Sequence, residues 1–137
     1  GKGEYAQLTF LAPSNLAIMT YMFNNNFRRV NEIPATECRR LLEKLIIPQR
    51  ILTSDVPRGS RSEATGEKTG GKTYTLMDGS EAFLWTFQES YLGVGNAGAV
   101  HLWFFIEKFA TSRRIYSSNI QTENGVVQAL GHDFLFE

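Results

Sequence analysis

The region between residues 81 and 109 constrains the fold more than any other part of the sequence, because it is β-rich and carries large aromatic side chains at both odd and even positions. Those aromatic residues are Phe83, Trp85, Phe87, Tyr91, Trp103, Phe104, Phe105 and Phe109. Successive side chains of a strand point to opposite faces of a sheet. A sheet with one wet face would not need large apolar groups on both sides. We therefore expect helices to cover one face, and more of the chain, a ligand or another protein to cover the other.

The turns around this region indicate an antiparallel arrangement. Asp78-Gly79 separates residues 74–77 from residues 81–91, which predicts a hairpin. Residues 100–109 have the branched and aromatic content of a strand. Asn124-Gly125 separates residues 114–121 from residues 126–129 and predicts a second hairpin. The tail, residues 132–137, alternates once more.

The first half of the chain mixes a strand with helical patterns. Residues 5–13 alternate as in a half-buried strand, with Ala6, Leu8 and Phe10 on one face. Residues 15–30 fit two structures. One is a helix capped by Ser14 or Asn15 with an apolar stripe; the other is a strand over residues 16–23. We favour the helix, whose stripe would be Leu16, Met19, Phe23, Phe27 and Val30.

A clearer helix is predicted between Pro34 and Pro48. Proline suits the first turn of a helix, and Glu37 supplies the negative charge favoured there. Apolar residues then recur at spacings of three and four, the period of a helix. They are Ala35, Cys38, Leu41, Leu42, Leu45 and Ile46.

Residues 53–73 break this pattern, because they contain several glycines and basic residues and almost nothing that would be buried. We expect a long mobile loop there. With 137 residues and 42% apolar content, the chain is long enough for one domain with a real core. The sequence thus predicts a single α+β domain over residues 1–137. An N-terminal strand and one or two helices would pack on a curved antiparallel sheet of four to six strands.

Two strings match phosphate-binding motifs, but their surroundings argue against that function. Residues 66–73, GEKTGGKT, match G-x-x-x-x-G-K-T. The motif needs a buried strand before it and a helix after it, and neither is predicted here. Residues 93–98, GVGNAG, match G-x-G-x-x-G, but no acidic residue follows about 20 residues later and too few residues remain for a parallel sheet. Neither string is expected to bind a nucleotide.

The charge balance does not favour a nucleic-acid partner. Fourteen basic residues balance fourteen acidic ones, whereas proteins that grip phosphates usually carry a positive excess. A local basic surface remains an alternative, with solvated side chains as the simpler interpretation. Its candidate anion contacts are Arg58, Arg61, Lys68, Lys72, Arg113 and Arg114.

Few residues suggest metal, redox or nucleophilic chemistry. The single cysteine, Cys38, lies on the apolar stripe of the second helix and is expected to be a buried, inert thiol. Two histidines without clustered carboxylates predict no metal site, and His132 and Asp133 are too close in sequence to form a catalytic pair on a strand. No cofactor and no catalytic residue is predicted, although an enzyme is not excluded.

No apolar run is long enough to cross a membrane, and the cellular compartment stays open. The sequence begins at Gly1 without methionine, so we expect that a tag, a signal peptide or an upstream domain preceded it.

Two functions fit these observations best. The first is a non-enzymatic binding or assembly module that uses the aromatic sheet to contact a protein, with a second copy as the favoured partner. The second is a small-ligand or enzymatic cup with an aromatic-lined cavity. The candidate ligand or partner surface comprises Trp85, Tyr91, His101, Trp103 and Phe105. A module predicts an apolar patch facing solvent, and a cup predicts a closed cavity with converging polar groups.

Overall fold

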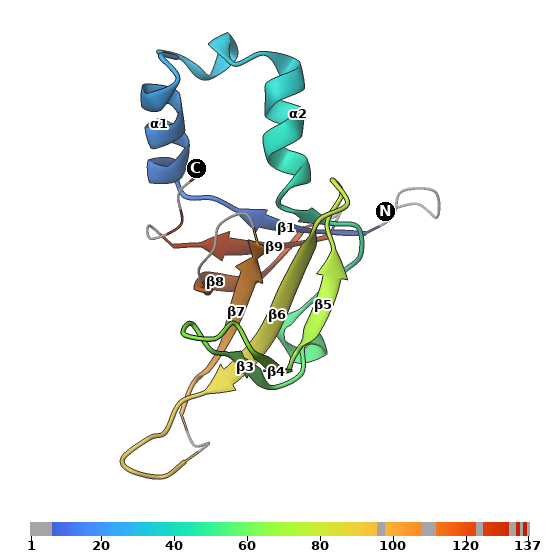
Figure 1. Ribbon diagram of the computed structural model, residues 1–137, viewed down its shortest axis with the longest axis vertical. Coiled ribbons are helices and arrows are strands. Elements are labelled where there is room, and N and C mark those ends of the chain that lie inside the picture. The colour runs from blue at the N-terminus through green and yellow to red at the C-terminus, as the bar shows by residue number, and fades with distance from the viewer. Residues whose placement is uncertain are drawn as a thin grey trace.

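Seven strands form one curved, mostly antiparallel sheet in the computed structural model (Figure 1), which describes residues 7–95, 98–107, 112–122, 125–131, 134 and 136. In spatial order the strands are β2 (Ile46–Ile47), β1 (Leu8–Ala12), β9 (Gly125–Leu130), β8 (Arg113–Thr122), β7 (Val100–Ile106), β6 (Glu81–Gln88) and β5 (Lys72–Thr75). Among the described strands of this sheet, β1 and β9 pair in parallel and the other neighbours are antiparallel. The predicted α+β class is confirmed, with a sheet one strand larger than the expected upper limit of six.

In the sequence, the remaining elements precede β2 or lie between β2 and β5. The helices are α1 (Asn15–Asn24) and α2 (Ala35–Glu43), and the 3-10 turns are η1 (Val30–Glu32) and η2 (Thr53–Asp55). Strands β3 (Gly59–Arg61) and β4 (Lys68–Gly70) form a separate two-stranded hairpin.

Strand β8 bends the sheet so that its two halves enclose one core. It pairs with β7 only at its first residues, Arg113 and Arg114, and then pairs with β9. Its register with β9 shifts on both sides of Ser117, and Asn119 has a φ of 60°. Such irregularities bend and twist a strand. Buried side chains from β1, β2 and β9 therefore meet those from β5, β6 and β7 in a single cluster.

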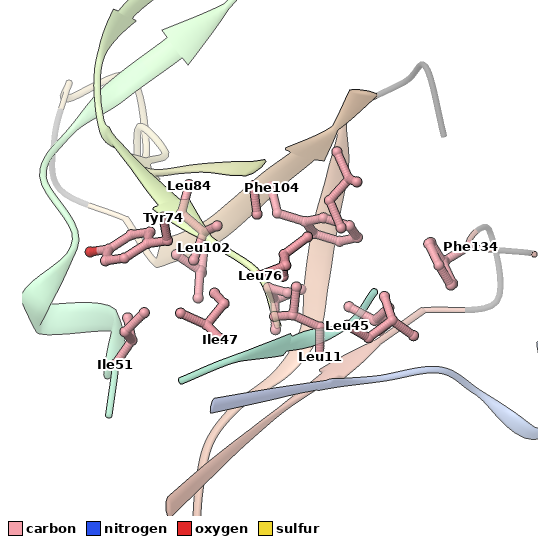
Figure 2. Packing of buried hydrophobic residues seen from close by; sticks show 14 of the residues in the cluster. Leu11, Leu45, Ile47, Ile51, Tyr74, Leu76, Leu84, Leu102, Phe104 and Phe134 are labelled. Atoms are coloured by element: carbon pink, nitrogen blue, oxygen red, sulfur yellow. The ribbon is translucent and has the colours of Figure 1, made fainter. Parts of the chain in front are cut away.

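Figure 2 shows this core between the two halves of the sheet. Leu11, Leu45, Ile47 and Ile51 are almost fully buried on one side, and Leu84, Leu102 and Phe104 on the other. Each aliphatic or aromatic side chain buried in this way contributes about 1.5–3 kcal/mol to folding. The sheet, folded over itself, thus supplies most of its own cover.

This arrangement corrects the expected cover of the aromatic strands. Helices were expected on one face, but the inner face of β6 and β7 packs mainly against β1, β2 and the segment after them. Helix α1 packs through Ala17, which belongs to the core, and Tyr21, whereas α2 contains no buried residue. Both helices project from one end of the sheet (Figure 1).

Strand β1 occurs where the alternation predicted it, but the opposite face is the more buried one. Thr9 and Leu11 are fully buried, whereas Leu8 and Phe10 are partly buried. The Thr9 hydroxyl donates to the Gln49 carbonyl over 2.7 Å and accepts from the Ile51 N–H over 2.8 Å. Burial of this polar group is therefore compensated by hydrogen bonds, which the apolar pattern alone does not reveal.

Both predicted helices are present. The favoured helical interpretation of residues 15–30 holds for Asn15–Asn24, and the Ser14 hydroxyl accepts from the Ala17 N–H over 3.3 Å as its N-cap. The second helix ends at Glu43 instead of continuing to Pro48. Leu45 and Ile47 become fully buried by leaving the helix, and Ile46–Ile47 pair with β1. This burial and strand pairing outweigh the helical period of Leu45 and Ile46.

Residues 53–73 are not the loop without regular structure that their composition suggests. They contain η2, β3, β4 and the first residues of β5. Backbone contacts fix the segment: the Thr86 N–H donates to the Pro57 carbonyl over 3.0 Å, and the Gly71 N–H to the Arg58 carbonyl over 2.9 Å. The first bond joins the segment to β6, which is distant in the sequence, and the second joins two parts of the segment itself.

The two predicted hairpins are confirmed as strand pairs. The Leu76 N–H donates to the Ser80 carbonyl over 2.8 Å, and Gly79 takes a φ of 89° in the turn between β5 and β6. Strands β8 and β9 form the second hairpin, although Asn124 lies outside the described residues. Phe109, His132, Asp133 and part of the tail also lie outside them.

Candidate functional site

The outer face of β6 and β7 carries the aromatic residues singled out in the sequence. Register places Phe83 opposite Phe105 and Trp85 opposite Trp103. The Phe83 and Trp85 rings lie 5.2 Å apart, and the Trp85 and Trp103 rings stack at 6.1 Å with an interplanar angle of 15°. Phe83, Trp85 and Phe105 are only 4–5% exposed, and Trp103 is partly buried. These four residues form a second small core, here called the aromatic face.

The β3–β4 hairpin covers the aromatic face. The Arg61 guanidinium lies 3.4 Å from the centre of the Phe105 ring, and the Lys68 ammonium lies 5.6 Å and 5.8 Å from the Phe83 and Phe105 rings. Cations over aromatic faces attract the ring quadrupole, more strongly where water is excluded. More of the chain, a ligand or another protein was expected to cover this face of the sheet, and the structure has more of the chain.

A cleft of about 390 Å³ remains between this hairpin and the sheet. Trp85, Phe87 and Trp103 line it from the sheet, and Arg61 and Glu63 line it from the hairpin. One guanidinium nitrogen of Arg61 (Nη1) lies 2.8 Å from Glu63 Oε2, and Nε of Arg61 is buried without a hydrogen-bond partner.

The Glu63 carboxylate at the edge of the cleft is held in its charged form. Its hydrogen bonds with Ser112 lower its pKa most strongly, and the Arg61 guanidinium lowers this pKa further. The cleft therefore combines indole rings with a charged pair at its rim.

The structure brings together some predicted ligand-contacting residues and separates others. Trp85 and Trp103 line the cleft, and Phe105 lies next to them under Arg61. His101 is not part of the cleft lining; its Nε2 lies 3.0 Å from Glu89 Oε2. Tyr91 is 60% exposed in a turn beyond the end of β6.

Each of the six predicted anion contacts interacts within its own chain. Arg58 donates to the Gln88 side chain over 2.7 Å, and the Arg114 guanidinium lies 3.4 Å from the His101 ring nitrogens. Arg113 donates to the Ser112 carbonyl over 3.3 Å, and Lys72 lies 5.3 Å from the Tyr74 ring. Arg61 and Lys68 lie over the aromatic face as described. These contacts are consistent with structural roles for the basic residues.

The phosphate-loop string lies in a different structural context from the one its motif requires. Residues 66–73 run through β4 and into β5, and the next element is strand β6 rather than a helix. The other string, residues 93–98, begins in a turn, and Asn96 and Ala97 lie outside the described residues.

A second hollow, which the sequence did not identify, lies between α1 and α2. The helices and the segment joining them, residues 14–43, are here called the helical arm. Its apolar groove has a volume of about 260 Å³. Ile18, Tyr21, Val30, Ile33, Cys38 and Leu41 are among the lining residues, and none of the described residues that line the groove is charged. Cys38, expected to be buried, is only partly buried at the wall of this groove.

A hydrogen-bonded chain of side chains ties the two helices of the arm together. The Tyr21 hydroxyl donates to Glu37, and Arg40 donates to the same carboxylate over 2.5 Å and 2.9 Å. The bonds from Arg40 and Tyr21 lower the pKa of Glu37 to about 2. Burial and the Glu37 carboxylate raise the pKa of Tyr21.

Large apolar side chains of the helical arm face solvent, both in the groove lining and on α1 outside it. Leu16, Met19 and Phe23 on α1 are 46%, 66% and 82% exposed, and Val30 and Leu42 are 63% and 44% exposed. Helix α1 has no charged residue, and a helix that is apolar all round is normally buried. The sequence signal for this surface is the absence of charge in NLAIMTYMFN. It indicates an uncovered apolar surface only when the helix is also known to project from the sheet.

The described residues hold no group of three or more His, Cys, Asp or Glu side chains that would bind a metal ion. No helix in the same part of the chain combines the length and hydropathy needed to cross a bilayer.

Comparison with known proteins identifies a similar fold. No protein-family model matches the sequence, and no curated protein matches it significantly. The structure is similar to that of a FAS1 domain pair from the insect cell adhesion molecule fasciclin I, with a TM-score of 0.55 and 17% sequence identity. The match covers 92% of this chain and 36% of that chain, so the chain spans about a third of the length of its structural neighbour. At this identity the likeness concerns the fold.

Proposed function

We propose that the protein is a non-enzymatic interaction module that binds a second copy of itself through the helical arm. The observation that carries this proposal is the apolar groove between α1 and α2, in whose lining Val30 and Leu42 are 63% and 44% exposed. Contiguous exposed apolar surface of this kind marks interaction sites in soluble proteins. Since α1 carries no charge, a second copy approaches it without like charges meeting.

The contact surface proposed here differs from the aromatic sheet surface favoured by the sequence. Trp85 and Phe105 are each 5% exposed beneath the β3–β4 hairpin, so little of their area is accessible to a partner. The arm has no comparable cover among the described residues.

The structural neighbour supports a contact between protein domains. That protein is a cell adhesion molecule whose FAS1 domains occur as a pair. Adhesion and domain pairing both depend on protein surfaces, so the shared fold agrees with an interaction module.

A small-ligand cup remains the second candidate, because the 390 Å³ cleft beside Trp103 has a volume within the ~300–1,000 Å³ range of ligand pockets. We favour it less, since Tyr91 and His101 stand outside the cleft and Trp85 presents little surface. Nucleic-acid binding through the basic residues is a third candidate, and the zero net charge does not favour it.

Light scattering or sedimentation over a wide concentration range tests the proposal. The average mass of the wild-type protein should rise from that of one chain as concentration increases. The arm variant Val30→Asp/Leu42→Asp changes two groove residues that are already exposed. It should stay a single chain because it places charges in the apolar groove.

The matched control is Tyr116→Asp/Ile120→Asp on β8, whose side chains are 71% and 45% exposed. This control should associate like the wild type. A wild-type protein that remains one chain at every concentration would overturn the proposal, as would an arm variant that associates normally.

A further inference from the structure

We propose that the apolar turn formed by residues 91–94 of one copy inserts into the groove of the helical arm of the next copy. This inference rests on the proposed self-association and names the element that docks. The turn lies outside both the aromatic face and the cleft, so neither of them gives it a role.

The turn is a closed and unusually apolar projection. The Tyr91 and Val94 backbones exchange two hydrogen bonds of 2.9 Å each, which closes a two-residue loop at Leu92 and Gly93. Tyr91, Leu92 and Val94 are 60%, 85% and 60% exposed. A short closed turn loses little backbone freedom on binding, so it presents these apolar side chains at a lower entropic cost than an open loop would.

Leu92 is an unfavourable choice for the turn by itself. It has a φ of 50° and Gly93 a φ of 81°, so both central residues occupy left-handed backbone conformations. Glycine, asparagine and aspartate are preferred in such two-residue turns. A bulky residue in this region is strained, and backbone strain concentrates at binding and switch sites. The strained position holds the most exposed large apolar side chain in the described structure.

The groove and the turn match in chemistry, since both are apolar. The described residues that line the groove carry no charge, and the turn residues Tyr91, Leu92, Gly93 and Val94 are uncharged as well. Its volume of about 260 Å³ falls below the ~300–1,000 Å³ typical of pockets for drug-sized ligands. A site of this kind suits aliphatic or aromatic anchors from a protein.

The positions of the turn and the groove make the contact intermolecular. The helical arm projects from one end of the molecule, and the loop after β6 that contains the turn projects from the other end (Figure 1). The turn therefore does not reach the groove of its own chain. A contact between unlike surfaces repeats from copy to copy, and it produces linear assemblies unless the rotation closes a ring.

Two variants and their mixture test this arrangement. Leu92→Asn removes the apolar side chain and places a favoured residue in the turn, so the fold should be as stable as the wild type or more stable. Self-association should weaken by about 10- to 100-fold, the value of one buried aliphatic anchor. The arm variant Val30→Asp/Leu42→Asp lacks a working groove but keeps its turn.

Mixing the two variants in equal amounts is the decisive measurement. The arm variant supplies an intact turn and Leu92→Asn supplies an intact groove, so the mixture should form complexes of two chains and no longer assemblies. If Leu92→Asn associates like the wild type, the turn is not the docking element, while self-association through the arm stands. If both variants are single chains and their mixture also stays single, a contact between unlike surfaces is excluded. A wild type that never associates would instead remove the proposed function itself.

Discussion

The aromatic face and the helical arm both carry large apolar side chains, but only the first is covered by its own chain. On the aromatic face, the β3–β4 hairpin reduces the exposure of Phe83, Trp85 and Phe105 to 4–5%. On the arm, Met19 and Phe23 are 66% and 82% exposed. The aromatic face was the more conspicuous region in the sequence, yet the arm has far more apolar surface available to a partner.

The difference shows that cover, rather than aromatic content, separates a core from a candidate interface. Arg61 and Lys68 of the hairpin lie over the Phe105 ring, so a basic polar segment completes the packing of an apolar one. Long basic side chains bury their aliphatic stems along apolar surface, including the faces of aromatic rings. Their charged groups remain paired or hydrated. The arm has no such segment over α1 in the described structure.

The largest expected effect separates the two regions by stability. Trp85→Ala should reduce the free energy of unfolding by about 3–5 kcal/mol, because it removes a buried aromatic ring from a packed cluster. Phe23→Ala, which removes an exposed ring, should change it by less than about 0.5 kcal/mol. Urea unfolding followed by circular dichroism measures both.

Trp85→Phe serves as the milder variant if Trp85→Ala does not fold, and its loss of stability should be intermediate. Equal losses for Trp85→Ala and Phe23→Ala would contradict the distinction between a covered and an uncovered region.

A smaller effect is expected from loosening the cover itself. Gly71 joins β4 to β5 with a φ of 62°, and a Cβ there would lie 2.7 Å from the Leu84 carbonyl oxygen and from the Phe83 ring. Gly71→Ala should therefore cost about 2–3 kcal/mol from backbone strain and close contact together. Both tryptophans of the chain, Trp85 and Trp103, lie on the aromatic face. Their fluorescence should shift to longer wavelength as the hairpin loosens.

Gly79→Ala is the control for this variant, because Gly79 also has a positive φ, 89°, but no atom lies within 4 Å of its added Cβ. It should lose only about 1 kcal/mol, from strain alone, and keep the wild-type tryptophan spectrum. A Gly71→Ala protein with unchanged fluorescence would show that the hairpin position does not depend on this close approach.

The smallest effect concerns the arm and its pH dependence. The folded-state pKa of Glu37 is about 2, lowered from its ordinary value of 4.5 chiefly by Arg40. The stabilisation from this carboxylate is therefore complete above about pH 4.5 and is lost as the pH falls toward 2. Helical circular dichroism should weaken over that window before tryptophan fluorescence changes, because the arm contains no tryptophan.

Glu37→Gln should abolish the loss of helical circular dichroism between about pH 4.5 and 2, since glutamine does not titrate. Because Glu37 lies near the surface, its contribution is expected to be small. An unchanged helical signal from pH 6 to pH 2.5 in the wild type would mean that the Tyr21–Glu37–Arg40 chain does not hold the arm together.

Much of the local structure followed from the sequence, because its signals act between near neighbours. Ser14 caps α1 through a hydrogen bond to a residue three positions away, and Gly79 forms its turn within five residues. The aromatic content of residues 81–109 correctly indicated a sheet with both faces covered. The site was only partly predictable: Trp85 and Trp103 stand together in the cleft, whereas Tyr91 and His101 stand outside it.

The remaining features depended on partners that are remote in sequence. Helix α2 ended early because Leu45 and Ile47 found places in the core beside β1. Gln128 is fully buried because its amide donates to the Ile51 carbonyl, 77 residues away, and to the Asn119 side chain. No local pattern marks such a glutamine as a core residue.

The sequence by itself therefore determined that residues 8–12 form a strand, that two helices follow and that two hairpins form the β-rich second half, because periodicity, capping and turn chemistry are local properties of the chain. Tertiary structure decided what covers each surface. Thr9 is buried through bonds to Gln49 and Ile51, the polar β3–β4 hairpin covers the aromatic face, and α1 keeps Leu16, Met19 and Phe23 exposed. These outcomes depend on contacts between distant segments, whose free energy outweighs the preference of any single residue.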